Sequence, residues 1–215
     1  AENGRKRKAL KTSRRATDLY RDLAKHNPAA YKPNLASCLN TLAILQAENG
    51  RKRKALKSSR RATDLYRDLA KHNPAEYKPN LASSLSNLAV YLAGNDQQRK
   101  ALKTSQEATS LYRDLAKHNP AAYNSNLASS LSNLAVYLAG NEQQHEALKT
   151  SQEATELCQQ LVNEHFRAFS SRFATTLETH ARILDHCGNA AEATRIRQKR
   201  DEVLKRMKEM EEGDA

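Results

Sequence analysis

Residues 47–92 read AENGRKRKALKSSRRATDLYRDLAKHNPAEYKPNLASSLSNLAVYL, and this 46-residue unit recurs along the chain. The string Ala-Leu-Lys fixes the register, since it begins at Ala9, Ala55, Ala101 and Ala147. A constant period of this length is typical of a stacked array, in which each unit buries its apolar face against its neighbours. Residues 1–46 differ from residues 47–92 at few positions, which indicates a recent duplication.

Each unit carries two helical patterns. In the first unit the longer pattern runs from about residue 5 to 26, where Ala9, Ala16 and Tyr20 share one face at 100° per residue. The shorter pattern runs from about residue 31 to 46, but Pro33 lies inside it and leaves its first turn unplaced. Neither helix can bury its apolar face alone, so the sequence predicts an all-α fold of antiparallel helix pairs.

The joints between the helices have two sequence signals. Lys-His-Asn-Pro occurs at residues 25–28, 71–74 and 117–120, where Asn can cap a helix that begins at Pro. Glycines precede each Ala-containing helix, and we expect them to end the preceding helix in a left-handed conformation. These glycines are Gly4, Gly50, Gly94, Gly140 and Gly188, whereas Gly213 belongs to the tail.

Composition agrees with a thin helical architecture. Only 39% of the 215 residues are hydrophobic, and the mean hydropathy is -0.83. No stretch has the roughly 20 apolar residues that a membrane span needs, and no signal segment opens the chain. The three cysteines lack paired spacing, so we expect an intracellular, cytoplasmic protein. The chain begins at Ala1 instead of Met, which predicts a fragment of a longer chain.

The pattern Leu131-x-x-Leu134-Ala135-x-x-Leu138, followed by Ala147 and Ala154, resembles the tetratricopeptide repeat. This resemblance implies a right-handed α-solenoid. The Asn-Leu-Ala strings at Asn87 and Asn133 are similar to repeats of kinesin light chains. The wider string Leu-Tyr-Arg-Asp-Leu-Ala-x-x-Asn-Pro is similar to arrays that follow the nucleotide-binding domain in NLR-type signalling proteins of fungi and bacteria.

The repeat phase divides residues 1–215, taken as one repeat domain, into segments. Residues 1–28 are predicted to be an orphan second helix, and residues 29–74, 75–120 and 121–166 are predicted to be three full repeats. Residues 167–212 form a degenerate fourth repeat, in which His180 replaces a leucine and a charged run follows. We expect that run to act as a polar C-terminal cap.

The resemblance also implies a binding surface, because partner peptides of this family lie in the concave groove lined by the first helices. Carried over, the groove residues are Ser37, Asn40, Ile44, Ser83, Ser86, Val90, Ser129, Ser132, Val136, Thr175, Glu178 and Arg182, with Asn87 and Asn133 beside them. Small polar side chains over an aliphatic floor suit an extended peptide. The alternative is that the serines allow close helix packing and the two asparagines bond to helix backbone.

Charge gives a second candidate surface. Residues 1–92 hold 20 basic and 7 acidic residues, whereas the remaining chain holds 16 and 17. A basic stripe opposite the core consists of Arg7, Lys11, Arg14, Arg21, Lys25, Arg53, Lys57, Arg60, Arg67 and Lys71. It could bind nucleic acid or an acidic protein by charge. Alternatively it is a solvated face, partly compensated by Asp18, Asp22, Asp64 and Asp68.

No motif predicts catalysis, a metal or a cofactor. His145-Glu146 lacks the second histidine of a zinc protease, and consecutive Asp185, His186 and Cys187 point about 100° apart on a helix. The sequence therefore predicts a non-enzymatic scaffold that binds a protein or peptide, with no membrane partner. Such a scaffold could be the sensing or self-associating part of an NLR-type protein, and the alternative function is polyanion binding by the basic half.

Overall fold

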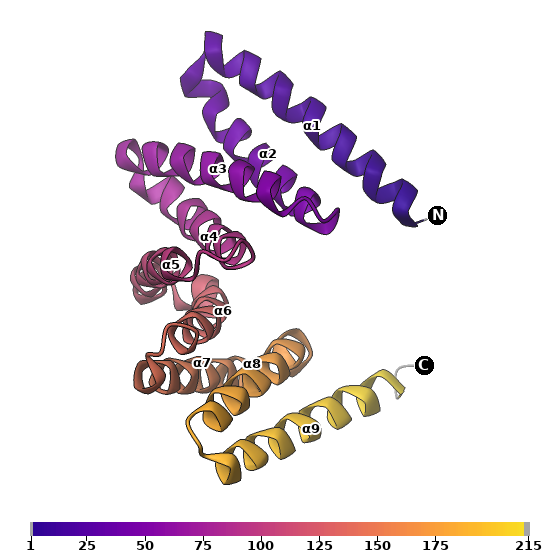
Figure 1. Cartoon of the computed structure of the whole chain (residues 1–215), viewed down its shortest axis with the longest axis vertical. Coiled ribbons are helices and arrows are strands. Elements are labelled where there is room, and N and C mark those ends of the chain that lie inside the picture. The colour runs from indigo at the N-terminus through magenta and orange to yellow at the C-terminus, as the bar shows by residue number, and fades with distance from the viewer. Residues whose placement is uncertain (1, 213–215) are drawn as a thin grey trace. The chain divides into compact units, whose positions relative to one another are not determined.

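The computed structural model describes residues 2–212, so Ala1 and the tail glycine Gly213 lie outside the described residues. The described residues form nine α-helices and no strand (Figure 1). The helices are α1 (Glu2–His26), α2 (Pro28–Glu48), α3 (Lys52–His72), α4 (Pro74–Ala93), α5 (Gln98–His118), α6 (Pro120–Ala139), α7 (Gln144–Glu164), α8 (Phe166–His186) and α9 (Ala190–Glu212). The predicted all-α class is confirmed.

The Asn-Pro joints start the shorter helices. The side chain of Asn27 accepts a hydrogen bond from the amide of Ala30 at 3.2 Å, and Pro28 is the first helical residue. Asn73 and Asn119 cap α4 and α6 in the same way. The predicted capping is therefore confirmed. Pro33 does not delay the start of α2, because the helix continues through it and loses one backbone hydrogen bond there.

The turns that end α2, α4, α6 and α8 share one geometry, but the prediction about their glycines was partly wrong. The left-handed residue has the same place in every repeat, with φ of 70° at Gly50, 60° at Asp96, 63° at Glu142 and 77° at Gly188. Gly94 and Gly140 are instead right-handed helix caps, two residues earlier, and Gly4 lies inside α1.

A backbone bond fixes each of these turns. The amide after the left-handed residue reaches back to a carbonyl five residues earlier, as in the bonds from Arg51 to Gln46 at 2.8 Å and from Gln97 to Leu92 at 3.0 Å. This is the Schellman arrangement, which requires one left-handed residue but not a glycine. Asp96 and Glu142 can therefore occupy a position where only two repeats have glycine.

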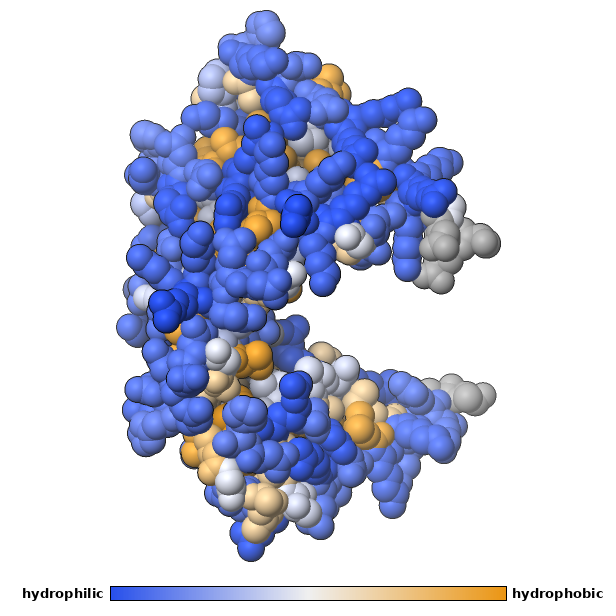
Figure 2. Space-filling view, in the orientation of Figure 1, coloured by the Kyte–Doolittle hydropathy of each residue, from blue (hydrophilic) through white to orange (hydrophobic). Residues whose placement is uncertain are grey.

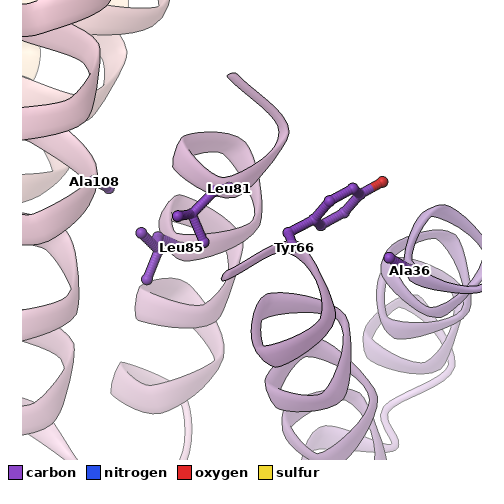
Figure 3. Packing of buried hydrophobic residues seen from close by; sticks show 5 residues of the cluster. All are labelled: Ala36, Tyr66, Leu81, Leu85 and Ala108. Atoms are coloured by element: carbon purple, nitrogen blue, oxygen red, sulfur yellow. The ribbon is translucent and has the colours of Figure 1, made fainter. Parts of the chain in front are cut away.

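The chain forms two compact units that divide within α5, after Leu111. In the N-terminal unit α2 packs against both α1 and α3, and α3 packs against α4. Figure 3 shows part of this core, in which Ala36, Tyr66, Leu81, Leu85 and Ala108 come from four successive helices. The small residues at Ala36 and Ala108 are completely buried, so they let neighbouring helices approach closely.

In the C-terminal unit α7 packs against α6 and α8, and α8 also contacts α6 and α9. Ala128, Cys158, Val162, Phe173 and Leu177 form a buried cluster of its core. His180, which stands where earlier repeats have leucine, is buried as well, and its Nδ1 lies 2.8 Å from the hydroxyl oxygen of Ser151.

Candidate functional site

The first helices of the four repeats are α2, α4, α6 and α8, and the second helices are the longer patterns at α1, α3, α5, α7 and α9. One position of the first helices exposes a large apolar side chain in three consecutive repeats. Ile44 on α2 is 43% exposed, and Val90 on α4 and Val136 on α6 are each 47% exposed. They are 46 residues apart, so they occupy the same position of the repeat, which we call a column. Isolated exposed apolar residues are ordinary, and what distinguishes these three is their repetition at one position of each helix. The fourth member of the column is Arg182 on α8.

Polar groups beside this column in the N-terminal unit have two kinds of environment. Asn40 Oδ1 accepts a hydrogen bond from the hydroxyl of Ser84 at 3.1 Å, which ties α2 to α4. The hydroxyl of Ser86 donates to the carbonyl of Ala82 at 3.1 Å. Ser37 forms a hydrogen bond with the buried Tyr66. These three predicted groove residues therefore help to hold the helices.

Asn87 differs from them. Its half-buried amide forms no hydrogen bond with the side chains and backbone that the structure describes, and the neighbouring Ser83 is exposed. An amide offers both donors and an acceptor. The hydrogen-bonding groups of Asn87 are therefore unused among the described residues, and the proposed bond to helix backbone is not formed.

The C-terminal unit repeats this arrangement on α6. Ser129 donates to the carbonyl of Ser125 at 3.1 Å and accepts a hydrogen bond from Arg172 of α8. Ser132 donates to Thr176 of α8 at 3.3 Å. Asn133 is exposed, and within residues 2–212 it has no hydrogen-bond partner. The serines again join helices, and the asparagine again stays available.

A pocket of about 230 Å3 adjoins Val136 between α6 and α8. Its other lining residues are Ala139, Gly140, Thr179, Arg182, Ile183 and His186. Val136 and Arg182 were predicted from the sequence, but Thr179 was not. Thr179 occupies the column of Asn87 and Asn133, so the repeat spacing could have predicted it. Exposed Thr175 lies on α8 as well, whereas Glu178 is bound by Arg200 of α9 and so is engaged within the fold.

The basic stripe lies on α1 and α3, and its members are exposed or half-buried. On the face drawn in Figure 2, the N-terminal unit is covered mainly by hydrophilic side chains. Arg21 pairs with Asp18, Lys25 pairs with Asp22 at 2.7 Å, and Arg67 pairs with Asp64 at 3.5 Å. The partial compensation therefore exists for these three cations. Lys25 also holds the pKa of the Asp22 carboxyl below its usual value.

Other members of the stripe are not compensated. Asp68 pairs with Lys32 of α2 at 2.9 Å and not with the stripe, and Lys32 lowers the pKa of Asp68. Arg60 donates to the side-chain oxygen of Gln97 at 2.9 Å. Besides Arg60, six cations have no ion pair with the described side chains, namely Arg7, Lys11, Arg14, Arg53, Lys57 and Lys71.

The potential metal ligands among the described residues do not gather in one place. Among residues 2–212, no three His, Cys, Asp or Glu side chains are placed to hold a metal ion together. Asp185 pairs with Arg197, and Cys38, Cys158 and Cys187 are free thiols. Burial raises the pKa of the Cys158 thiol, which keeps it protonated and unreactive. In the same part of the chain no helix is both long and apolar enough to cross a membrane.

Comparison with known proteins bears on the fold. The family model of the tetratricopeptide repeat matches residues 127–167, which include the later part of α6 and all of α7. No curated protein sequence matches the chain. Among solved structures, a kinesin-light-chain-like protein of Podosopora anserina with nearly identical TPR-like repeats has a TM-score of 0.72 at 15% identity, over 97% of this chain and 91% of that one.

Two further structures have the same architecture. BtubC (BKLC) from P. vanneervenii has a TM-score of 0.60 at 16% identity, over 94% of this chain and 92% of that one. MamA has a TM-score of 0.59 at 14% identity, over 90% and 89% of the two chains. At such identities the likeness concerns the fold alone. One repeat is matched by the family model and 97% of the chain is matched in structure, so the chain has the α-solenoid fold of tetratricopeptide repeat arrays.

Proposed function

We propose that this chain is a non-catalytic scaffold that binds an extended segment of a partner protein along the first helices of its repeats. The exposed apolar column of Ile44, Val90 and Val136 is the observation that carries this proposal. Solenoids of this fold generally serve as protein-interaction scaffolds. The resemblance of the Leu-Tyr-Arg-Asp-Leu-Ala strings to NLR-type arrays supports a place in a larger signalling protein.

The polar groups beside the column explain how such a segment would be held. An extended peptide has unpaired backbone N–H and C=O groups, which need partners when the peptide is bound. Asn87 and Asn133 offer an acceptor and two donors each, and both have no partner among the described residues. Alternate side chains of the peptide would then lie on Ile44 and Val90 of the N-terminal unit.

A second candidate function is the binding of a polyanion, and the six uncompensated stripe cations on α1 and α3 favour it. Cations on two successive second helices would contact phosphates without reading a sequence. Such binding would weaken steeply as salt rises, because counterions are released from the polyanion. Contacts in the apolar column would persist under the same conditions.

The groove proposal is tested with a peptide selected against the whole chain from a random library, with its affinity measured by fluorescence anisotropy. We expect Val90→Arg and Val136→Arg each to weaken binding about tenfold or more, because a guanidinium must be desolvated against the peptide. Asn87→Ala should weaken it as well.

Leu19 supplies the control. Its side chain is 59% exposed on α1, outside the column, so Leu19→Arg adds the same charge at another exposed apolar site and should leave the affinity unchanged. If Val90→Arg and Val136→Arg bind the selected peptide as well as the wild type does, the groove proposal is wrong. Affinity that falls with salt and is lost on Lys11→Ala with Lys57→Ala would favour the polyanion function instead.

A further inference from the structure

The second helices of successive repeats are joined by a repeated ion pair between residues 40 apart. Arg67 Nη2 on α3 donates to both carboxylate oxygens of Glu107 on α5, at 3.1 Å each. Arg113 on α5 likewise reaches both carboxylate oxygens of Glu153 on α7, at 3.3 and 2.5 Å. We call this contact the Arg–Glu bridge. Two-point contact makes it stronger and more directional than a simple ion pair.

The first position in this series has no glutamate. Arg21 on α1 occupies the column of Arg67 and Arg113, but Arg61 on α3 stands where Glu107 and Glu153 stand later. Two arginines therefore face the place that one Arg–Glu bridge fills elsewhere. Both line a crevice of about 450 Å3, whose other lining residues are Leu35, Leu39, Asp64, Leu65 and Asp68.

The last position in the series supports the link between a missing bridge and an open crevice. Gln159 on α7 and Lys199 on α9 occupy the two columns there, and they also line a crevice, of about 410 Å3. At the two bridged positions the carboxylate lies between the helices. Both positions that lack the glutamate thus line a crevice.

Of the four charged side chains that line the first crevice, three have an ion-pair partner and one has none among the described residues. Asp64 is bound by Arg67 at 3.5 Å, and Asp68 is bound by Lys32 at 2.9 Å. Arg21 pairs with Asp18 of its own helix. Arg61 has neither a hydrogen bond nor an ion pair with the described residues, although a guanidinium has five donors. The unsatisfied charge in the crevice is therefore positive.

We propose that Arg21 and Arg61 bind a glutamate side chain of a partner protein, whose carboxylate takes the place that Glu107 and Glu153 hold in the bridged repeats. An apolar neighbour of that glutamate would pack on Leu35, Leu39 and Leu65. Carboxylate is favoured over phosphate because Asp64 and Asp68 also line the crevice and repel a dianion more strongly. The two arginines lie on second helices, and none of the lining residues of the crevice belongs to the groove.

The test uses the whole chain and the peptide acetyl-Leu-Glu-Leu-amide, with acetyl-Leu-Gln-Leu-amide as its neutral counterpart. Binding is followed by NMR through the side-chain Nε–H signals of Arg21 and Arg61. We expect both signals to shift and the glutamate peptide to bind about tenfold more tightly, because its contact with the arginines is charge-assisted and two-pointed.

Two variants locate the site. Arg61→Glu recreates the pairing found at Arg67 and Glu107, so it should reduce binding of the glutamate peptide to the level of the neutral peptide and raise the unfolding midpoint. Arg53→Glu is the matched control, since it makes the same charge change on α3 outside the crevice and should keep the binding. Should Arg61→Glu not fold, Arg61→Gln removes the charge alone and must still abolish the preference.

Three outcomes would overturn the proposal. Equal losses in Arg61→Glu and Arg53→Glu would show that only the general positive charge attracts the peptide. Signals of Arg21 and Arg61 that do not shift at saturation would place the peptide elsewhere. If inorganic phosphate or a short single-stranded RNA shifts the same two signals and binds more tightly than the glutamate peptide, the assignment to carboxylate is wrong.

Discussion

His180 is a titratable group in a position that other repeats fill with leucine, at Leu88 and Leu134. Burial lowers the pKa of His180 below its ordinary value of 6.5, and the nearby Glu156 and Glu192 only partly oppose that shift. Its Nδ1 lies 2.8 Å from the Ser151 hydroxyl. The imidazole is therefore neutral in the folded chain, whereas the unfolded chain takes up a proton below about pH 6.5.

This difference makes stability depend on pH. Because the unfolded state binds the extra proton, the free energy of unfolding should fall as pH drops through the unfolded pKa, by at most about 1.4 kcal/mol per pH unit. Urea unfolding at about pH 7.5 and about pH 5.5 measures the loss. His180→Leu should reduce it, whereas exposed His26→Gln should not. Equal pH dependence in wild type and His180→Leu would exclude His180 as its source.

The two kinds of glycine give a second test at the scale of single residues. Gly50 has a φ of 70°, so Gly50→Ala should cost about 1 kcal/mol of stability, the strain of a left-handed alanine. Gly94 is a helical cap whose added Cβ would lie 3.4 Å from the Val90 carbonyl, an ordinary contact. Gly94→Ala should therefore be neutral or stabilising. Urea midpoints compare them, and equal losses would contradict the assignment of the turn position.

At the scale of helices, the sequence predicted which face of each helix is buried. The spacing of Leu35, Leu39 and Leu42 predicted one face of α2, and all three are buried. The Asn27 cap was predicted, but the first turn of α2 was left unplaced because Pro33 lies inside the helical pattern. The Asn27 cap and the packing of α2 on two neighbours offset the single hydrogen bond that Pro33 removes. Local propensity was overruled by tertiary packing.

The sequence predicted one candidate site, the exposed apolar column, but not the other, the crevice. The exposed column of Ile44, Val90 and Val136 follows from the repeat phase, since one position per first helix points away from the core. The crevice between Arg21 and Arg61 did not follow, because the two residues are 40 positions apart and belong to helices of different repeats. Only the packing of α1, α2 and α3 shows that they line one space.

At the scale of the whole molecule, stability should be a sum over repeats, since helices contact mainly their neighbours along the chain. Deleting residues 47–92 joins Gln46 to Ala93, which occupies the column of Ala47, so α2 would pack against α5 as it now packs against α3. The shortened chain should fold, and the urea m-value should fall by about a fifth, in proportion to the surface exposed on unfolding.

The same deletion closes the crevice, because Arg21 would then face Glu107, and the preference for acetyl-Leu-Glu-Leu-amide should disappear. The control deletes residues 47–86, which removes less of the chain but joins α2 to the middle of α4 and breaks the 46-residue register. Circular dichroism during urea unfolding compares the two. If the in-register deletion unfolds without a cooperative transition, or if both deletions behave alike, the stability of this array does not arise repeat by repeat.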